Sequence, residues 1–121
     1  MAKILVVEDD ESVRVFTARA LGADGHDVAV AEDGDCGLSM ICETHGDFDL
    51  VLSDIRMPVL DGIEMAKQAA GAYPELKILL MTGYAEQRER AGDLTDIIID
   101  VVPKPFTLSD IRQAVTSALA A

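Results

Sequence analysis

Five short runs of aliphatic residues recur along the chain, and segments with a helical spacing of apolar positions lie between them. The first, fourth and fifth runs consist almost entirely of Ile, Leu and Val, which is typical of strands buried on both faces of a parallel sheet. The pattern therefore predicts five strands, at residues 4–7, 28–31, 50–52, 78–81 and 97–102.

Helices are predicted between these strands and after the last one. The second helix begins after Asp33 and the last after Thr107, because both residues are good N-caps and Thr107 has Asp110 three residues on. The third follows Gly62 and ends before Tyr73-Pro74. Amphipathic spacing predicts the buried stripes of the first and last helices. These are Val13, Phe16, Thr17, Ala20 and Leu21 in the first and Leu108, Ile111, Val115 and Leu119 in the last.

The segment at residues 85–94 differs from the other predicted helices. Its middle is polar, and it offers only alanines and Leu94 for burial. We therefore expect it to be the least firmly held element. Five alternations of strand and helix predict an α/β fold, in which helices cover both faces of a doubly wound, five-stranded parallel sheet. We expect a single domain over residues 1–121, without an attached output module.

Composition excludes several classes of function. The formal net charge is −12, whereas nucleic-acid binding draws much of its affinity from cationic side chains, so we expect no nucleic-acid partner. No apolar run approaches the roughly 20 residues that span a bilayer, and the start does not resemble a signal peptide. We therefore expect a cytoplasmic protein without a membrane partner. Cys36 and Cys42 match no zinc or redox motif and are predicted to be small buried side chains.

Polar residues follow four of the five predicted strands. In an open parallel sheet, ligands bind beyond the carboxyl ends of the strands, so these residues are expected to gather at one edge. They are Glu8, Asp9 and Asp10 after the first strand, Asp54 after the third, Thr82 after the fourth and Lys104 after the fifth.

This combination favours phosphoryl chemistry. Neighbouring carboxylates repel one another unless a cation joins them, and hard oxygen ligands together with a phosphate suit Mg²⁺. A carboxylate can attack phosphorus to form an aspartyl phosphate, while an ammonium and a hydroxyl stabilise the transferred group. Taken singly, Asp54 could cap a turn, Thr82 could be a structural hydroxyl and Lys104 an ordinary surface lysine. Their joint placement at separate strand ends indicates a functional site.

The chain resembles the receiver domains of two-component response regulators over nearly its whole length. The matching segments are Val6 to Asp10, Leu52 to Pro58, Asp61-Gly62, Met81 to Gly83 and Lys104 to Phe106. The resemblance implies a flavodoxin-like fold, a Mg²⁺ cofactor, and phosphotransfer from a histidine kinase or a histidine phosphotransfer protein. It also implies a signalling protein, not an enzyme, whose only activities are its own phosphorylation and dephosphorylation.

By this resemblance Asp54 is the phosphoacceptor, Thr82 the switch hydroxyl and Lys104 the phosphate-binding cation. The Lys104-Pro105 bond resembles the cis-proline turn of the family, which X-Pro energetics allow. Many receivers carry an aromatic residue three places before the lysine, where this chain has Val101. We expect the movement of Thr82 to be transmitted instead through Tyr84 and the 85–94 segment.

The resemblance also implies a set of metal ligands. Glu8, Asp9, Asp54 and the backbone carbonyl of Arg56 would hold Mg²⁺, with Asp9 favoured as the direct ligand and Glu8 acting through water. Asp10 lies one place beyond the acidic pair and is interpreted as nearby charge.

We expect the phosphorylation signal to be passed on through protein contacts to an unknown target. The protein itself is expected to be a monomer or a weak phosphorylation-dependent dimer. The layout is similar to that of motility switches, relay intermediates and CpdR-like regulators of protein degradation. One alternative is a pseudo-receiver that binds proteins without phosphorylation. Another is an aspartate-based phosphatase of the haloacid dehalogenase type, which would have an acid at the position of Arg56.

Overall fold

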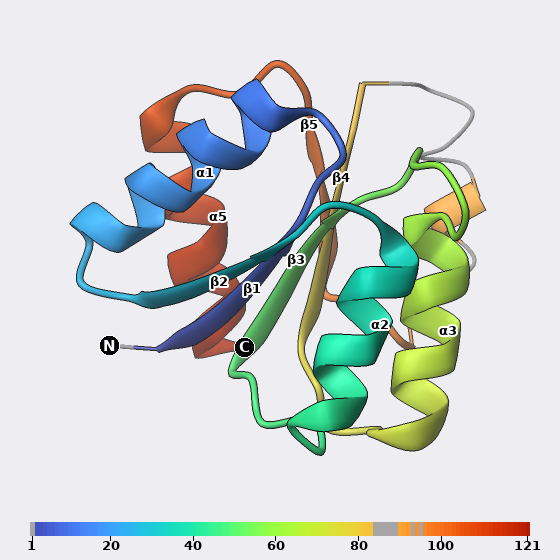
Figure 1. Cartoon of the computed structure of the whole chain (residues 1–121). Helices are drawn as coiled ribbons and strands as arrows, with labels where there is room; N and C mark the ends of the chain where they lie inside the picture. The colour runs from blue at the N-terminus through green and yellow to red at the C-terminus, as the bar shows by residue number, and fades with distance from the viewer. Residues whose placement is uncertain (1, 84–89, 93, 95) are drawn as a thin grey trace.

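The chain forms a five-stranded parallel sheet between two layers of helices (Figure 1). The computed structural model describes residues 2–83, 90–92, 94 and 96–121. In chain order, its elements are β1 (Lys3–Val7), α1 (Glu11–Ala23), β2 (Asp27–Ala31), α2 (Gly34–Glu43), β3 (Leu50–Asp54), α3 (Gly62–Ala72), β4 (Ile78–Thr82), β5 (Asp100–Pro103) and α5 (Leu108–Ala120).

The strands are arranged in the order β2-β1-β3-β4-β5, which confirms the doubly wound topology. The order of strands reverses at β1, because the chain goes first to one side to form β2 and then to the other side to form β3. Val7 lies opposite Ser53, and Asp54 lies opposite Met81. The ends of β1 and β3 therefore meet at the switch point of the sheet, where this fold class places its ligands.

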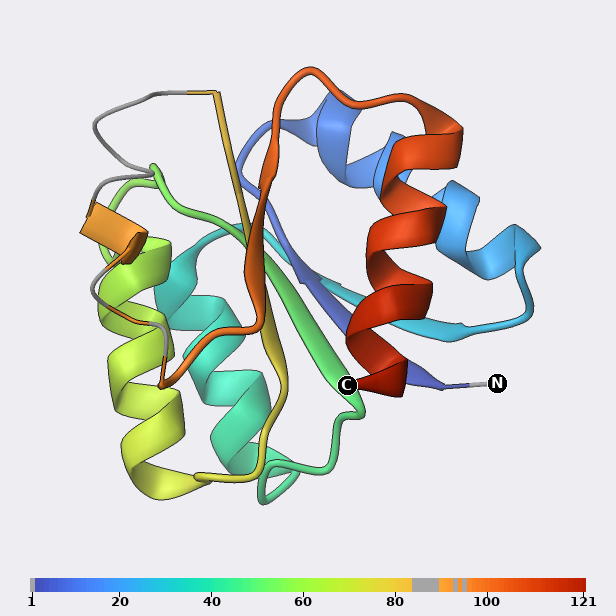
Figure 2. The same cartoon turned by 180° about the vertical axis from the view of Figure 1, so that it is seen from behind.

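Each face of the sheet is covered by its own helices. Helices α1 and α5 lie on one face and α2 and α3 on the other, as the two opposite views show (Figures 1 and 2). Alternate residues of β1 supply both cores, because successive strand side chains point to opposite faces. Leu5 and Val7 pack with α2 and α3, and Ile4 and Val6 pack with α1 and α5.

Each of the four helices in the described part of the chain begins at a side-chain cap. Asp10, Asp33, Asp61 and Thr107 each accept a hydrogen bond from the backbone N–H three residues later. The capping box predicted at Thr107 and Asp110 is present, as is the predicted cap at Asp33. Within the described part of the chain, no helix is both long enough and apolar enough to cross a membrane.

The last strand is shorter than its apolar run predicts. Residues 97–102 were expected to be extended, but β5 begins only at Asp100. The N–H groups of Ile97 and Ile98 both donate to the carbonyl oxygen of Leu94, at 2.8 and 2.9 Å, so this part of the run forms a turn. Ile98 is buried in that turn. An apolar run shows burial, but it does not distinguish a buried turn from a buried strand.

The predicted burial of four side chains is wrong. Phe16 and Leu108 are 42% and 45% exposed, although both fall on the amphipathic stripes of their helices. Cys36 and Cys42 are exposed, because α2 instead buries the face that carries Gly34, Gly37 and Ile41.

The predicted helix at residues 85–94 falls mostly outside the described residues, and so does Tyr84. Of its described members, Ala91 and Leu94 are buried in the core between the sheet and α3. Arg90 forms an ion pair with Asp61, with 3.0 Å between Nη2 and Oδ2. This contact joins the middle of the segment to the N-cap of α3.

Candidate functional site

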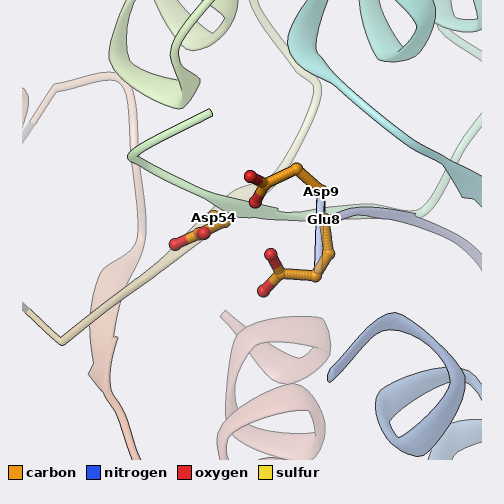
Figure 3. Close-up of side chains that lie close together, drawn as sticks. All are labelled: Glu8, Asp9 and Asp54. Carbon is orange, nitrogen blue, oxygen red and sulfur yellow. The ribbon is translucent and has the colours of Figure 1, made fainter. Parts of the chain in front are cut away.

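Three carboxylates meet at the switch point between β1 and β3. Glu8 and Asp9 follow β1, Asp54 ends β3, and one oxygen of each lies within 4.8 Å of the others. Figure 3 shows the three carboxyl groups pointing to the same side. Glu8 is fully buried, Asp54 is 7% exposed and Asp9 is exposed. Three carboxylate oxygens at this separation repel one another and form a donor set that fits a hard divalent cation such as Mg²⁺.

Lys104 supplies a positive charge beside two of these carboxylates. Its Nζ lies 2.6 Å from Oε1 of Glu8 and 3.2 Å from Oδ2 of Asp54. The peptide bond between Lys104 and Pro105 is cis, as predicted. Burial lowers the pKa of Lys104, but its hydrogen bond to Glu8 and the charge of Asp54 outweigh burial, so the pKa is raised overall. Lys104 is therefore held as a cation.

Glu8 is fixed through both its side chain and its backbone. Oε1 accepts from Lys104, and Oε2 accepts from the N–H of Asp10 at 3.2 Å. The N–H of Glu8 donates to the carbonyl of Ala31, while its own carbonyl accepts from Nη1 of Arg14 at 2.9 Å. Burial raises the pKa of Glu8 to about 7, against the opposing effect of Lys104.

Asp54 is held at the end of the buried strand by local contacts. The N–H of Ile55 donates to Oδ1 of Asp54 at 3.0 Å, which leaves Oδ2 on the side of Lys104. The N–H of Gly62 donates to the carbonyl of Ile55 at 2.8 Å and closes the loop after the strand. A Cβ at Gly62 would lie 2.1 Å from the carbonyl oxygen of Asp54, so only glycine allows this close approach.

A cavity of about 830 Å³ opens at these carboxylates. Its lining includes the three acids and Lys104 as well as Phe16 and Phe106. The centroids of these two rings lie 6.3 Å apart. The cavity lining therefore combines charged groups, which suit a phosphate, with apolar side chains.

The other predicted site residues lie at the same edge. Arg56 is exposed and lines the cavity. Thr82 is only 1% exposed, and its carbonyl accepts from the N–H of Lys104 at 2.9 Å. Val101, at the position where the family often has an aromatic ring, is half-buried against the core. Asp10 caps α1, a role beyond the nearby charge assigned to it.

The sequence alone did not indicate Arg14 or Phe16 as parts of this region. Phe16 was expected in the core, but it lines the cavity that opens at the acids. Arg14 carried no motif signal of its own, because its partner is a backbone carbonyl. The N-cap role of Asp10 could have been predicted, since an aspartate directly before a helix is a common cap.

Comparisons with known proteins identify a matching family model and similar chains. A family model described as the response regulator receiver domain matches residues 4–116. The chain is 40% identical over 109 residues to the response regulator MprA of Mycobacterium tuberculosis, covering 90% of this chain and 46% of MprA. It is 33% identical over 118 residues to the sensor kinase CckA of Brucella abortus, covering 98% of this chain and 12% of CckA. It therefore spans less than half the length of both relatives.

A solved structure extends the comparison to three dimensions. The response regulator TrrA of Thermotoga maritima, in complex with Mg²⁺-BeF, superposes with a TM-score of 0.87 at 29% identity, covering 98% of this chain and 99% of TrrA. The solved structure therefore agrees with the fold of this chain over nearly its whole length.

Proposed function

Because the chain belongs to the response regulator receiver domain family of two-component signalling, we propose that Asp54 accepts a phosphoryl group in a Mg²⁺-dependent reaction. The observation that supports this most directly is the position of Lys104, whose Nζ lies 3.2 Å from Oδ2 of a nearly buried Asp54. A cation at this distance lowers the cost of bringing a charged phosphoryl group to a carboxylate.

In the proposed reaction, a carboxylate oxygen of Asp54 attacks the phosphorus of a phosphohistidine. The bond between phosphorus and oxygen forms as the bond between phosphorus and nitrogen breaks, and the imidazole leaves with the electron pair and takes up a proton. Ile55 holds one oxygen of Asp54 through its N–H, and Lys104 faces the other. Thr82 would then donate a hydrogen bond to the phosphoryl group, as the family resemblance implies.

Receiver domains bind Mg²⁺ at an acidic pocket, and this chain has such a cluster. We propose Glu8, Asp9, Asp54 and the backbone carbonyl of Arg56 as the protein ligands. Asp9 is exposed and suits direct coordination, whereas both carboxylate oxygens of Glu8 already accept hydrogen bonds, which favours coordination through water. The bound cation would neutralise charge on the phosphoryl oxygens.

Receiver domains are signalling domains that interact with histidine kinases or phosphotransfer proteins. We propose that residues 1–121 act as one domain in the cytoplasm and take their phosphoryl group from such a donor. Phosphorylation would change contacts with a protein target, from a monomer or a weak dimer. The residues proposed for phosphorylation favour this role over that of a pseudo-receiver.

The test is intact-mass spectrometry after incubation with acetyl phosphate, with and without Mg²⁺. We expect one phosphate adduct on the wild type that is absent without Mg²⁺ and absent in Asp54→Asn. Asp47→Asn makes the same chemical change at an exposed aspartate that pairs with Lys3, and it should leave the adduct intact. No adduct on the wild type, also with phosphoramidate as donor, would favour a phosphorylation-independent binding module.

A further inference from the structure

Arg14 reaches from the first turn of α1 to the backbone of the acidic loop. Its Nη1 donates to the carbonyl oxygen of Glu8 at 2.9 Å. Arg14 is half-buried and Glu8 is fully buried. Glu8 is the first residue after β1, where the chain turns from the sheet towards the helix. The hydrogen bond therefore joins the helix to the peptide that connects Glu8 to Asp9.

We propose that Arg14 is a positioning residue of the metal site, which orients the Glu8–Asp9 peptide so that the Asp9 carboxylate faces Asp54. This inference rests on the proposed Mg²⁺ function of the cluster. Arg14 itself touches neither the phosphoacceptor nor the cation in this role. It acts only through the carbonyl that it binds.

Asp9 depends on its backbone more than the other two carboxylates do. Glu8 and Asp54 are buried and accept hydrogen bonds through their side chains. Asp9 is exposed, so burial does not fix its carboxylate, and the peptide that carries Asp9 decides where this side chain starts. Two hydrogen bonds hold the backbone on either side of Asp9. Arg14 donates to the Glu8 carbonyl, and the N–H of Asp10 donates to the Glu8 carboxylate. Loss of the first contact would allow Asp9 to leave the other two acids.

Two other roles for Arg14 predict different results. A purely structural role, satisfying a carbonyl where the strand ends, would lower thermal stability without changing the affinity for Mg²⁺. A purely electrostatic role is opposite in sign, because removing a positive charge near three carboxylates strengthens their attraction for a cation. Only the positioning role predicts weaker Mg²⁺ binding when Arg14 is shortened.

The experiment is titration of the unphosphorylated protein with MgCl₂, followed by the backbone amide shifts of residues 8–10 and 54–56. For Arg14→Ala we expect the dissociation constant for Mg²⁺ to rise about fivefold or more, a loss typical of supporting contacts around a metal site. Arg14→Lys keeps a charged donor on a long side chain and should stay within about twofold of wild type. Arg19→Ala is the matched control, because it removes the same charge from an exposed position of the same helix.

An unchanged or smaller dissociation constant in Arg14→Ala would overturn the proposal, as would a lower melting temperature with unaltered affinity. If Arg14→Ala does not fold, Arg14→Met keeps the apolar stem and is judged by the same criterion. Wild-type protein that does not bind Mg²⁺ would overturn the proposed function and this inference together. If the wild type binds Mg²⁺ and Arg14→Ala binds it equally well, this inference alone would be overturned.

Discussion

The ammonium of Lys104 lies closer to Glu8 than to Asp54, at 2.6 Å from Oε1 of Glu8 and 3.2 Å from Oδ2 of Asp54. The lysine proposed to bind phosphate is therefore paired with a carboxylate proposed to serve the metal. Because a cation in the acidic cluster would compete for Glu8, we expect metal binding to loosen this pair and leave Lys104 for the phosphoryl group.

The affinity for Mg²⁺ is expected to rise with pH around neutrality. Glu8 has a pKa of about 7, and a cation favours the ionised carboxylate, so protons compete with the metal below that pH. Between about pH 6 and about pH 8 the apparent affinity should rise roughly tenfold. Amide-shift titrations at several pH values measure this. In Glu8→Gln the pH dependence should be much flatter, and an unchanged slope would assign the proton to another group.

The stability of the metal-free protein should change in the opposite direction with pH. The folded pKa of Glu8, about 7, exceeds its ordinary value of 4.5, so the folded state keeps a proton that the unfolded state has lost. The contribution of Glu8 to the free energy of unfolding is full below about pH 4.5 and is lost as the pH rises through about 7. We expect a decrease of about 1–3 kcal/mol over that range. Urea unfolding in EDTA measures it, and Glu8→Gln should lack it.

Gly62→Ala should damage both the fold and the phosphoacceptor. The added Cβ would lie 2.1 Å from the carbonyl oxygen of Asp54, so the backbone at the site has to move. We expect a loss of about 1–3 kcal/mol and slower formation of the phosphate adduct. Gly71→Ala in the same helix is the control, because its added Cβ meets nothing within 4 Å. It should stabilise the protein by up to about 1 kcal/mol. Equal effects of the two substitutions would contradict the steric explanation.

Val59→Asn should stabilise the protein. Val59 has a φ of 71°, which is strained for a β-branched residue, and the N–H of Leu60 donates to the carbonyl of Pro58 across it. Val59 is 83% exposed, so its side chain contributes little burial. Asparagine tolerates this conformation, and we expect a gain of about 1 kcal/mol in urea unfolding. Val59→Thr keeps the branched Cβ and should give no comparable gain.

Thr17→Val should also stabilise the fold, for a different reason. The hydroxyl of Thr17 is buried in α1 without a hydrogen-bond partner among the described residues. Replacing it with a methyl group of similar size removes the cost of an unpaired polar atom, about 1 kcal/mol. Thr116→Val is the matched control, since that exposed hydroxyl donates to the carbonyl of Arg112. A higher urea midpoint in the control than in Thr17→Val would sink this prediction.

Much of the fold could be predicted because its signals are local. Runs of Ile, Leu and Val indicate buried strands wherever they occur, and Asp33 and Thr107 cap helices through bonds to residues three places away. The gathering of Glu8, Asp9, Asp54 and Lys104 follows from the topology, because parallel strands end at the same edge of a sheet. Fold class and the composition of the candidate site were therefore determined by the sequence itself.

Tertiary structure decided which of these groups contact one another. Lys104 and Glu8 are 96 residues apart, and nothing local to either shows that they pair, or that burial raises the pKa of Glu8. Phe16 lies on a predicted apolar stripe, yet it lines the cavity beside Phe106. An apolar stripe shows which face of a helix is apolar, but not whether a neighbouring element covers the whole of that face. Periodicity and motifs report what a segment can bury or bind. Pairing and burial depend on distances across the assembled sheet, which only the folded chain has.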